Sequence, residues 1–241
     1  MMTDNKFKAV FFDAEHTLFC TRVSRPQVYL DAAIEHGATD ISRELVASEI
    51  SRATSAFEDT IDGNLRFSHS WWLAYNTSIF SALGLASKAA VRASKSIDAY
   101  YSKADAYQVY PETIEILKVL SATGIQIGVL ANWAEDLPAL CKRLKIQKHF
   151  GFIISSSELR ALKPDRAVFD RILFRCGVAA EHALHVGADF ERDVCGALNA
   201  GMNAALIDRS DNLDNELHEG VRVINSLHDV LDICELTAHG I

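Results

Sequence analysis

The sequence predicts an α/β fold, a Rossmann-like parallel sheet flanked by helices, with an α-helical insertion after the first strand. An apolar run near the N-terminus ends abruptly in Asp13, as a buried strand does where it emerges into a site. Residues 21–108 then show helical spacing, whereas residues 109–241 alternate short apolar strands with helices. We therefore expect an α/β core domain formed by residues 1–20 and 109–241, and a helical cap domain formed by residues 21–108.

The first strand is predicted at residues 9–12, whose sequence is Ala-Val-Phe-Phe. Such a run suits a strand that is buried on both faces of a parallel sheet. Ligands of open α/β sheets bind at the carboxyl ends of the strands. Asp13 is therefore expected at the mouth of a ligand site.

The insertion is predicted to be helical throughout. Helix start signals occur at Ser24, two residues before Pro26, and at Asp40. A third amphipathic helix is expected around Trp71, and residues 86–103 form a fourth. Aromatic residues at helical spacing are typical of the core of a helical bundle.

The second part of the core is predicted from its alternating pattern. The expected strands are residues 125–130, 152–155, 183–186, 204–207 and 221–224. The expected helices are residues 112–120, 137–144, 166–176, 194–200 and 227–236. Gly124, after the first of these helices, is a typical helix-terminating residue.

Composition restricts the class of protein. The chain has 241 residues, 49% of them hydrophobic, which is enough to bury a core and an inserted subdomain. The net charge of −8 and the lack of a Lys/Arg stripe argue against nucleic-acid or anionic-membrane partners. Five scattered cysteines without a Cys-x-x-Cys pair favour reduced thiols. With no signal-peptide pattern or membrane-length apolar stretch, we expect a cytoplasmic protein, whose oligomeric state the sequence leaves open.

Polar residues follow the predicted strands and should meet at one edge of the sheet. They are Asp13 and Glu15 after the first strand, Asn132 after the second, residues 155–157 and then Lys163 after the third, and Asp189 and Asp193 after the fourth. Clustered carboxylates need a counter-cation or raised pKa values. Magnesium is the simplest cation, because it binds through one or two carboxylates, water and substrate phosphate.

The order of these motifs resembles the haloacid dehalogenase superfamily. The motifs are Asp13-x-Glu15-x-Thr17, Val129-Leu130-Ala131-Asn132, Leu162-Lys163-Pro164-Asp165, His185-Val186-Gly187-Ala188-Asp189 with Asp193, and residues 196–201. The resemblance covers essentially the whole chain and is to the phosphatase-like branch with an all-helical cap after the first motif. It implies a hydrolase that acts on a small phosphorylated metabolite chosen by the cap.

The resemblance also implies residue roles. Asp13 would be the nucleophile that forms an aspartyl ester, and Glu15 the general acid and base. Lys163 would neutralise the nucleophile and the developing charge. Thr17 and Asn132 are the candidate substrate-binding residues. The acidic positions assigned to magnesium are Asp13, Glu15, Asp189 and Asp193.

Three positions depart from the family pattern. Glu15 is one methylene longer than the usual aspartate, Ala131 lacks the usual hydroxyl, and Ala188 replaces the usual metal-binding aspartate. Asp189 is adjacent to Ala188, but neighbouring residues of an extended segment point to opposite sides.

These departures leave three hypotheses open. The first is a magnesium-dependent phosphatase that works through Asp13. The second is a metal-independent hydrolase resembling the 2-haloacid dehalogenases, which Ala188 favours and a second carboxylate at Glu15 disfavours. The third is a degenerate member of the family that binds a ligand or partner without turnover.

Overall fold

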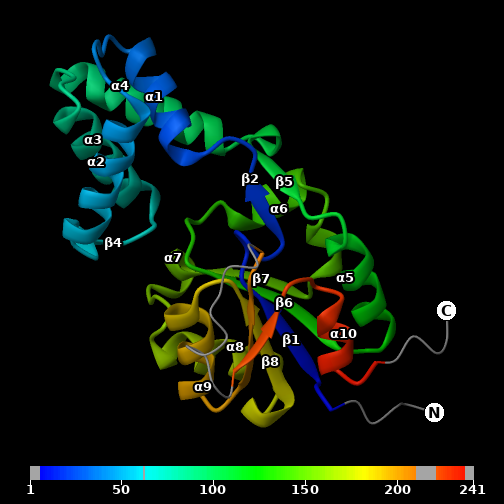
Figure 1. Cartoon of the computed structure of the whole chain (residues 1–241). Coiled ribbons are helices and arrows are strands. Elements are labelled where there is room, and N and C mark those ends of the chain that lie inside the picture. Colours follow the sequence, from blue (N-terminus) through cyan, green and yellow to red (C-terminus); the bar gives the residue numbers. More distant parts are fainter. Residues whose placement is uncertain (1–5, 62, 210–220, 237–241) are drawn as a thin grey trace. The chain divides into compact units, whose positions relative to one another are not determined.

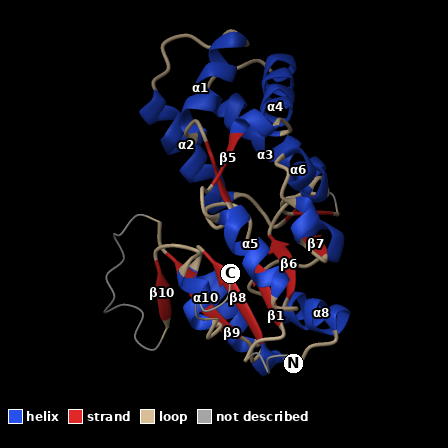
Figure 2. Ribbon diagram, turned by 90° about the vertical axis from the view of Figure 1, so that its right-hand side faces the viewer, coloured by secondary structure: helices blue, strands red, loops and turns tan. Residues whose placement is uncertain are grey.

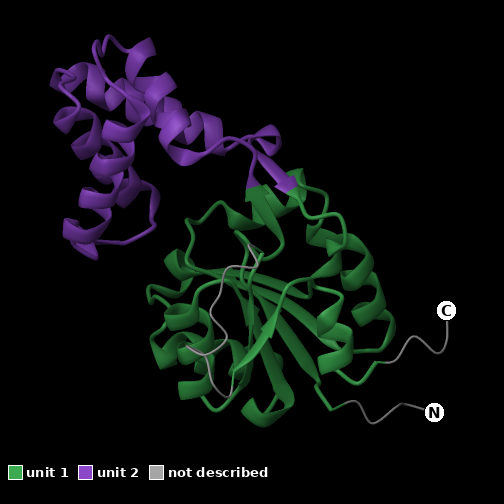
Figure 3. Ribbon diagram, in the orientation of Figure 1, with its two compact units in different colours: residues 1–20, 109–241 green, residues 21–108 purple. Residues whose placement is uncertain are grey.

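The computed structural model describes residues 6–61, 63–209 and 221–236. The chain divides into two compact units, which Figure 3 shows in different colours. Unit 1 comprises residues 1–20 and 109–241, and unit 2 comprises residues 21–108.

Unit 1 is built on a parallel sheet with the strand order β10-β9-β8-β1-β6-β7 in the described part of the chain (Figure 1). Its strands are β1 (Ala9–Phe12), β6 (Gln126–Ala131), β7 (Phe152–Ser155), β8 (Ala183–Gly187), β9 (Asn203–Ile207) and β10 (Arg222–Ile224). The predicted α/β class with a Rossmann-like parallel sheet is confirmed.

Strand β1 is central and fully buried. Its last residue, Phe12, lies in register with Val129 of β6 and Val186 of β8. The next residue, Asp13, still donates its backbone N–H to the carbonyl of Val186 at 2.9 Å. Asp13 therefore leaves the sheet between the carboxyl ends of two neighbouring strands.

Helices cover the sheet of unit 1. They are α5 (Thr113–Ala122), α6 (Leu137–Arg143), α7 (Ser156–Leu159), α8 (Arg166–Cys176), α9 (Gly196–Asn199) and α10 (Asp229–Ile233), with the 3₁₀ turns η2 (Gln147–His149) and η3 (Ala180–His182) and the π-helical turn η4 (Phe190–Cys195). Helices α8 and α9 pack with the sheet around Phe11, Leu130 and Phe169. Helices α5 and α10 lie on the other side of the sheet in Figure 1.

Unit 2 contains α1 (Arg25–Glu35), α2 (Arg43–Ala56), α3 (His69–Ala82) and α4 (Ser87–Tyr101), with the 3₁₀ turn η1 (Ala104–Ala106). Its core is rich in aromatic residues, and Trp71 stacks on Tyr75 with ring centroids 4.9 Å apart. The buried Tyr29 hydroxyl donates to Asn76 Oδ1 at 2.6 Å. The aromatic residues at helical spacing thus form a bundle core, as their pattern predicts.

Several element predictions differ from the structure in detail. Asp40 was the expected start of the second helix, but α2 begins at Arg43 because Ser42 Oγ caps it by accepting from the N–H of Leu45. The helix expected at residues 194–200 is a π-helical turn, η4, followed by α9. The expected helix at residues 227–236 is the shorter α10.

Short strands were also missed. Unit 2 carries the hairpin β3 (Thr60–Ile61) and β4 (Asn64–Leu65). Strand β2 (Phe19–Thr21) pairs with β5 (Tyr107–Val109), where the chain enters and leaves the insertion; both strands are labelled in Figure 1, and β5 also in Figure 2. Strands of two or three residues are too short to show alternation. Within the described ranges, no helix combines the length and the apolar character that crossing a membrane requires.

Candidate active site

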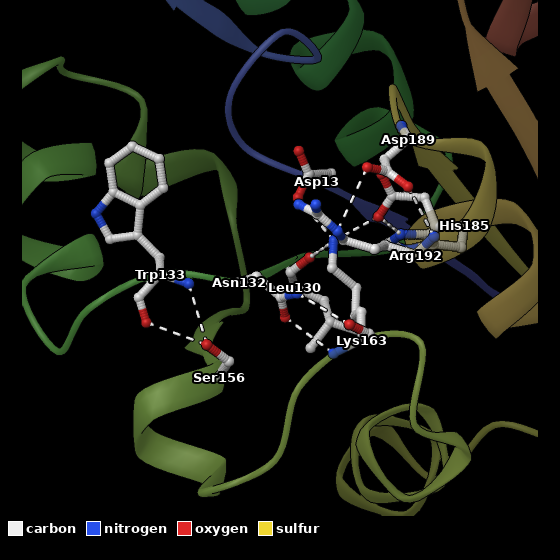
Figure 4. A network of polar contacts seen from close by, with 10 residues as sticks. Asp13, Leu130, Asn132, Trp133, Ser156, Lys163, His185, Asp189 and Arg192 are labelled. Atoms are coloured by element: carbon white, nitrogen blue, oxygen red, sulfur yellow. Dashed lines mark hydrogen bonds and ion pairs between the residues drawn. The ribbon is translucent and has the colours of Figure 1, made fainter. Parts of the chain in front are cut away.

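Lys163 lies at the centre of a buried polar network at the carboxyl edge of the sheet (Figure 4). Its Nζ donates to Asp13 Oδ1 at 2.7 Å and to the carbonyl oxygen of Leu130 at 2.9 Å. It also forms a short contact with Asp193 Oδ1. The Lys163 side chain is 2% exposed and that of Asp13 is 17% exposed. One ammonium group is therefore shared by two carboxylates, and only Asp13 is partly open to solvent.

Asp193 is held from several directions. Its Oδ1 also contacts His185 Nε2 at 3.0 Å, and its Oδ2 accepts from the backbone N–H of Asp189 at 3.0 Å. Its side chain is 2% exposed. Both oxygens of Asp193 thus have partners within the protein.

Gly187, the last residue of β8, lets Asp193 approach the sheet. A Cβ added to this glycine would lie 2.2 Å from Cγ and 2.3 Å from Oδ2 of Asp193. Real Cβ atoms do not come so close to other heavy atoms, so any side chain at position 187 would displace the carboxylate.

Asn132 fixes the backbone of Lys163. Its Nδ2 donates to the Lys163 carbonyl at 3.0 Å, and its Oδ1 accepts from the Lys163 N–H at 2.9 Å. Both ends of the Asn132 amide are occupied in this way. Contact between Asn132 and a substrate stays a prediction.

Two other predicted residues lie in the loop after β1. Glu15 is partly exposed, and its side chain makes no hydrogen bond or ion pair with the described residues. Thr17 is buried; its hydroxyl has no partner within the described ranges, and its carbonyl accepts from Arg209 at 2.7 Å. The carboxylate of Glu15 is thus available for chemistry, whereas the backbone of Thr17 has a structural contact.

The charges of the network set its pKa values. Burial raises the pKa of Asp13 to about 7, and Asp193 adds to this effect while Lys163 opposes it. Burial would raise the pKa of Asp193 as well, but Lys163 and His185 hold it well below its usual range. Burial depresses the Lys163 pKa, yet the two carboxylates raise it above its ordinary value. Because the charges of ionised Asp193 and protonated Lys163 offset each other, ionising Asp13 adds an uncompensated negative charge, in line with its raised pKa.

The donor atoms do not fit a preformed magnesium site. Ala188 supplies no ligand, and the Asp189 side chain accepts from the backbone N–H of Arg192 at 2.8 Å, which caps η4. Both oxygens of Asp193 accept hydrogen bonds from groups of the protein. No group of three or more His, Cys, Asp or Glu residues in the described part of the chain is arranged to hold a metal ion. The predicted placement of Asp189 as a ligand therefore requires that its capping contact be broken.

Sequence reasoning did not assign a role to His185 or Ser156. His185 is a polar residue in an apolar strand, and that contrast is the signal that could have singled it out. Ser156 Oγ accepts from the backbone N–H of Trp133 at 3.1 Å, which ties the segment after β6 to α7. Its role depends on a contact between segments far apart in sequence, for which the sequence gives no signal.

Comparison with known proteins identifies the family. A family model for haloacid dehalogenase-like hydrolases matches residues 75–207, which is more than half of the chain. The chain belongs to the haloacid dehalogenase-like hydrolase family. The resemblance seen in the sequence motifs is thereby confirmed.

Sequence relatives of this haloacid dehalogenase-like hydrolase include phosphatases. It is 28% identical over 142 residues to haloacid dehalogenase-like hydrolase domain-containing protein 3 of Danio rerio, covering 58% of this chain and 59% of that protein. The match thus spans less than two thirds of that relative. This chain is also 27% identical over 219 residues to glyceraldehyde 3-phosphate phosphatase of Methanothermobacter thermautotrophicus. That alignment covers 83% of this chain and 85% of the phosphatase.

Solved structures of family members share the fold. A phosphatase from Thermococcus onnurineus matches with a TM-score of 0.68 and 24% identity, covering 94% of this chain and 97% of that one. A 2-haloacid dehalogenase from Pseudomonas syringae matches with a TM-score of 0.68 and 23% identity, with the same coverage. The fold therefore does not distinguish between these two activities.

Proposed function

We propose that this haloacid dehalogenase-like hydrolase cleaves the phosphate ester of a small molecule through an aspartyl intermediate at Asp13. The observation that carries the proposal is the 2.7 Å contact between Asp13 Oδ1 and Lys163 Nζ at the carboxyl edge of the sheet. A carboxylate at this edge that is paired with a fixed ammonium is suited to nucleophilic catalysis on an anionic group.

In the first step a carboxylate oxygen of Asp13 attacks phosphorus. An aspartyl phosphate bond forms, and the bond between phosphorus and the ester oxygen breaks with its electron pair moving to that oxygen. Glu15 donates a proton to the leaving oxygen. Lys163 balances charge at the nucleophile throughout the step.

In the second step a water molecule attacks the phosphorus of the intermediate. Glu15, now ionised, takes a proton from this water, and the bond between phosphorus and Asp13 breaks with its electrons returning to the carboxylate. Inorganic phosphate leaves and the site is regenerated. The protons gained and lost by Glu15 balance over the cycle.

The proposal contains no step through magnesium. The family resemblance implies magnesium dependence, but the residues that the structure describes lack the ligands for a preformed site. Mg²⁺ commonly binds through few carboxylates together with substrate phosphate and water. The activity assay with and without the metal decides this point.

The phosphatase assignment is supported by the relative from Methanothermobacter thermautotrophicus, which is aligned along most of both chains. We assign substrate selection to residues 21–108, the helical unit inserted after the first motif, acting as a cap. The substrate class is a small phosphorylated metabolite. We further propose a cytoplasmic location, for which the scattered cysteines are the support.

The test is hydrolysis of an aryl phosphate, with released phosphate measured in Mg²⁺ and in EDTA. We expect turnover by the wild type and a loss of at least about 1000-fold in Asp13→Asn, because the amide is a poor nucleophile. Asp170→Asn is the matched control, since Asp170 is half-exposed on α8 in an ion pair with Arg166. Equal activity of the wild type and Asp13→Asn would overturn the proposal.

A second candidate is a metal-independent hydrolase similar to the 2-haloacid dehalogenases. Two observations favour this activity, which needs no metal. Ala188 offers no metal ligand, and both oxygens of Asp193 already accept hydrogen bonds within the protein. Glu15 disfavours it, since a second carboxylate would repel a carboxylate substrate. Release of halide from a short 2-haloacid in EDTA, lost in Asp13→Asn, would select this activity. If the wild type and Asp13→Asn both bind a ligand and neither releases phosphate or halide, the protein has a degenerate, binding-only role.

A further inference from the structure

We propose that His185 is a positioning residue for the nucleophile: by donating a hydrogen bond to Asp193, it keeps the Lys163 ammonium shared with Asp13. This inference rests on the proposed function, in which Asp13 is the nucleophile. His185 touches neither Asp13 nor a substrate in this arrangement, so it acts through Asp193 and Lys163.

His185 lies in the middle of β8, where a buried polar side chain requires a hydrogen-bonding partner. It is fully buried and lies in register with Phe11 of β1 and Ala204 of β9. Its ring meets the ring of Phe169 edge-on at 5.5 Å. Burying a polar ring among apolar groups costs free energy unless it is hydrogen-bonded. The contact with Asp193 is the hydrogen bond that offsets this cost.

The direction of the hydrogen bond follows from its partners. An ionised carboxylate only accepts hydrogen bonds, so His185 Nε2, 3.0 Å from Asp193 Oδ1, carries the hydrogen. Nδ1 is buried without a partner among the described residues. Nε2 is therefore the hydrogen-bonded nitrogen of the His185 ring, and Asp193 is its partner.

That donor affects how the ammonium is shared. Asp193 Oδ1 accepts from both His185 and Lys163, while Oδ2 is satisfied by the backbone of Asp189. If the histidine donor is removed, Oδ1 depends on Lys163 alone, because the site is closed to water at Asp193. Lys163 should then move toward Asp193 and away from Asp13. The nucleophile would lose its cation without the loss of any group that touches the substrate.

Two variants of similar side-chain volume separate positioning from packing. His185→Gln keeps a donor near the position of Nε2, and His185→Leu removes it. We expect His185→Leu to lower kcat for the aryl phosphate at least about 10-fold with KM changed less than about threefold, as is common for residues that orient a reacting group. His185→Gln should recover most of kcat. Equal losses in both variants, or a fall in melting temperature with kcat unchanged, would overturn the proposal.

A readout that does not need activity keeps this inference separate from the proposed function. In a crystal structure of His185→Leu, we expect the contact between Lys163 Nζ and Asp13 Oδ1 to exceed hydrogen-bonding distance, and in His185→Gln to stay near the 2.7 Å of the wild type. An unchanged contact in His185→Leu would overturn the positioning role. If the wild type shows no turnover, the proposed function fails, and these two structures still test whether His185 controls the position of Lys163.

Discussion

The carboxyl group of Asp193 lies against the Cα of Gly187, in the volume that a Cβ on Gly187 would fill. This contact brings Asp193 within reach of both His185 and Lys163. The glycine here is required by close approach of a side chain, since its φ lies outside the left-handed region.

Gly187→Ala should therefore displace Asp193. We expect a loss of about 1–3 kcal/mol in the free energy of unfolding, typical of an overpacked core, and at least a 10-fold loss of aryl phosphate hydrolysis. Gly151→Ala is the matched control, because the nearest atom to its Cβ would be the Ile127 carbonyl oxygen at 3.7 Å. Denaturant unfolding and kinetics check both variants. A Gly187→Ala protein with wild-type stability would show that Asp193 can move aside without cost.

Asp13→Asn should stabilise the protein at neutral and higher pH. The pKa of Asp13 is raised from 3.8 to about 7, so the folded state binds more protons than the unfolded state between these values. The free energy of unfolding contributed by this group therefore falls as pH rises through that window. An asparagine does not titrate, so the variant keeps the free energy of unfolding that the wild type loses, which is on the order of 2–4 kcal/mol. The melting temperature of Asp13→Asn relative to the wild type should rise from pH 5 to pH 8; a constant difference would contradict the raised pKa.

Asn132→Ala should weaken the placement of Lys163. It removes the hydrogen bonds at 3.0 and 2.9 Å that hold the Lys163 backbone. We expect a stability loss of about 1–2 kcal/mol and a 10- to 100-fold loss of kcat. Asn199→Ala, at an exposed position on α9, is the control. If kcat stays within twofold of the wild type while stability falls, Asn132 supports only the fold.

Ala188→Asp should create a response to magnesium. The wild type lacks a carboxylate at this position, and Asp189 is engaged in capping η4. We expect the melting temperature of the wild type to be unchanged by 10 mM Mg²⁺, and that of Ala188→Asp to rise, because a metal that binds only the folded state stabilises it. Ca²⁺ and EDTA serve as comparisons by thermal unfolding. A magnesium-dependent rise in the wild type would show that the native donors suffice.

Much of the fold was predictable because its signals are local. Helix α8 has the predicted bounds, since Asp165 caps its N-terminus and Gly177 ends it in a left-handed conformation. Strand β7 also has the predicted bounds. The second helix of the insertion was misplaced at its start because Asp40 and Ser42 are both good capping residues, and only the structure selects Ser42.

The candidate site was predictable in its residues but not in their contacts. Strand order brings Asp13, Lys163 and Asp193 together, which the motif spacing predicted. The sequence does not tell which partner each side chain takes. The side chain of Asp189, a predicted metal ligand, caps its own turn by accepting from the backbone N–H of Arg192. Its role as a ligand stays a prediction.

The chain segments that lead into and out of residues 21–108 are hydrogen-bonded to each other, and this pairing has a practical consequence. Within unit 1 the Tyr110 N–H donates to the Leu18 carbonyl at 3.1 Å, and the Thr113 hydroxyl donates to the same oxygen at 2.9 Å. The two segments of unit 1 that flank the insertion are thus hydrogen-bonded to each other. A short glycine-containing turn should be able to connect them, so that the helical insertion can be deleted or replaced by another one.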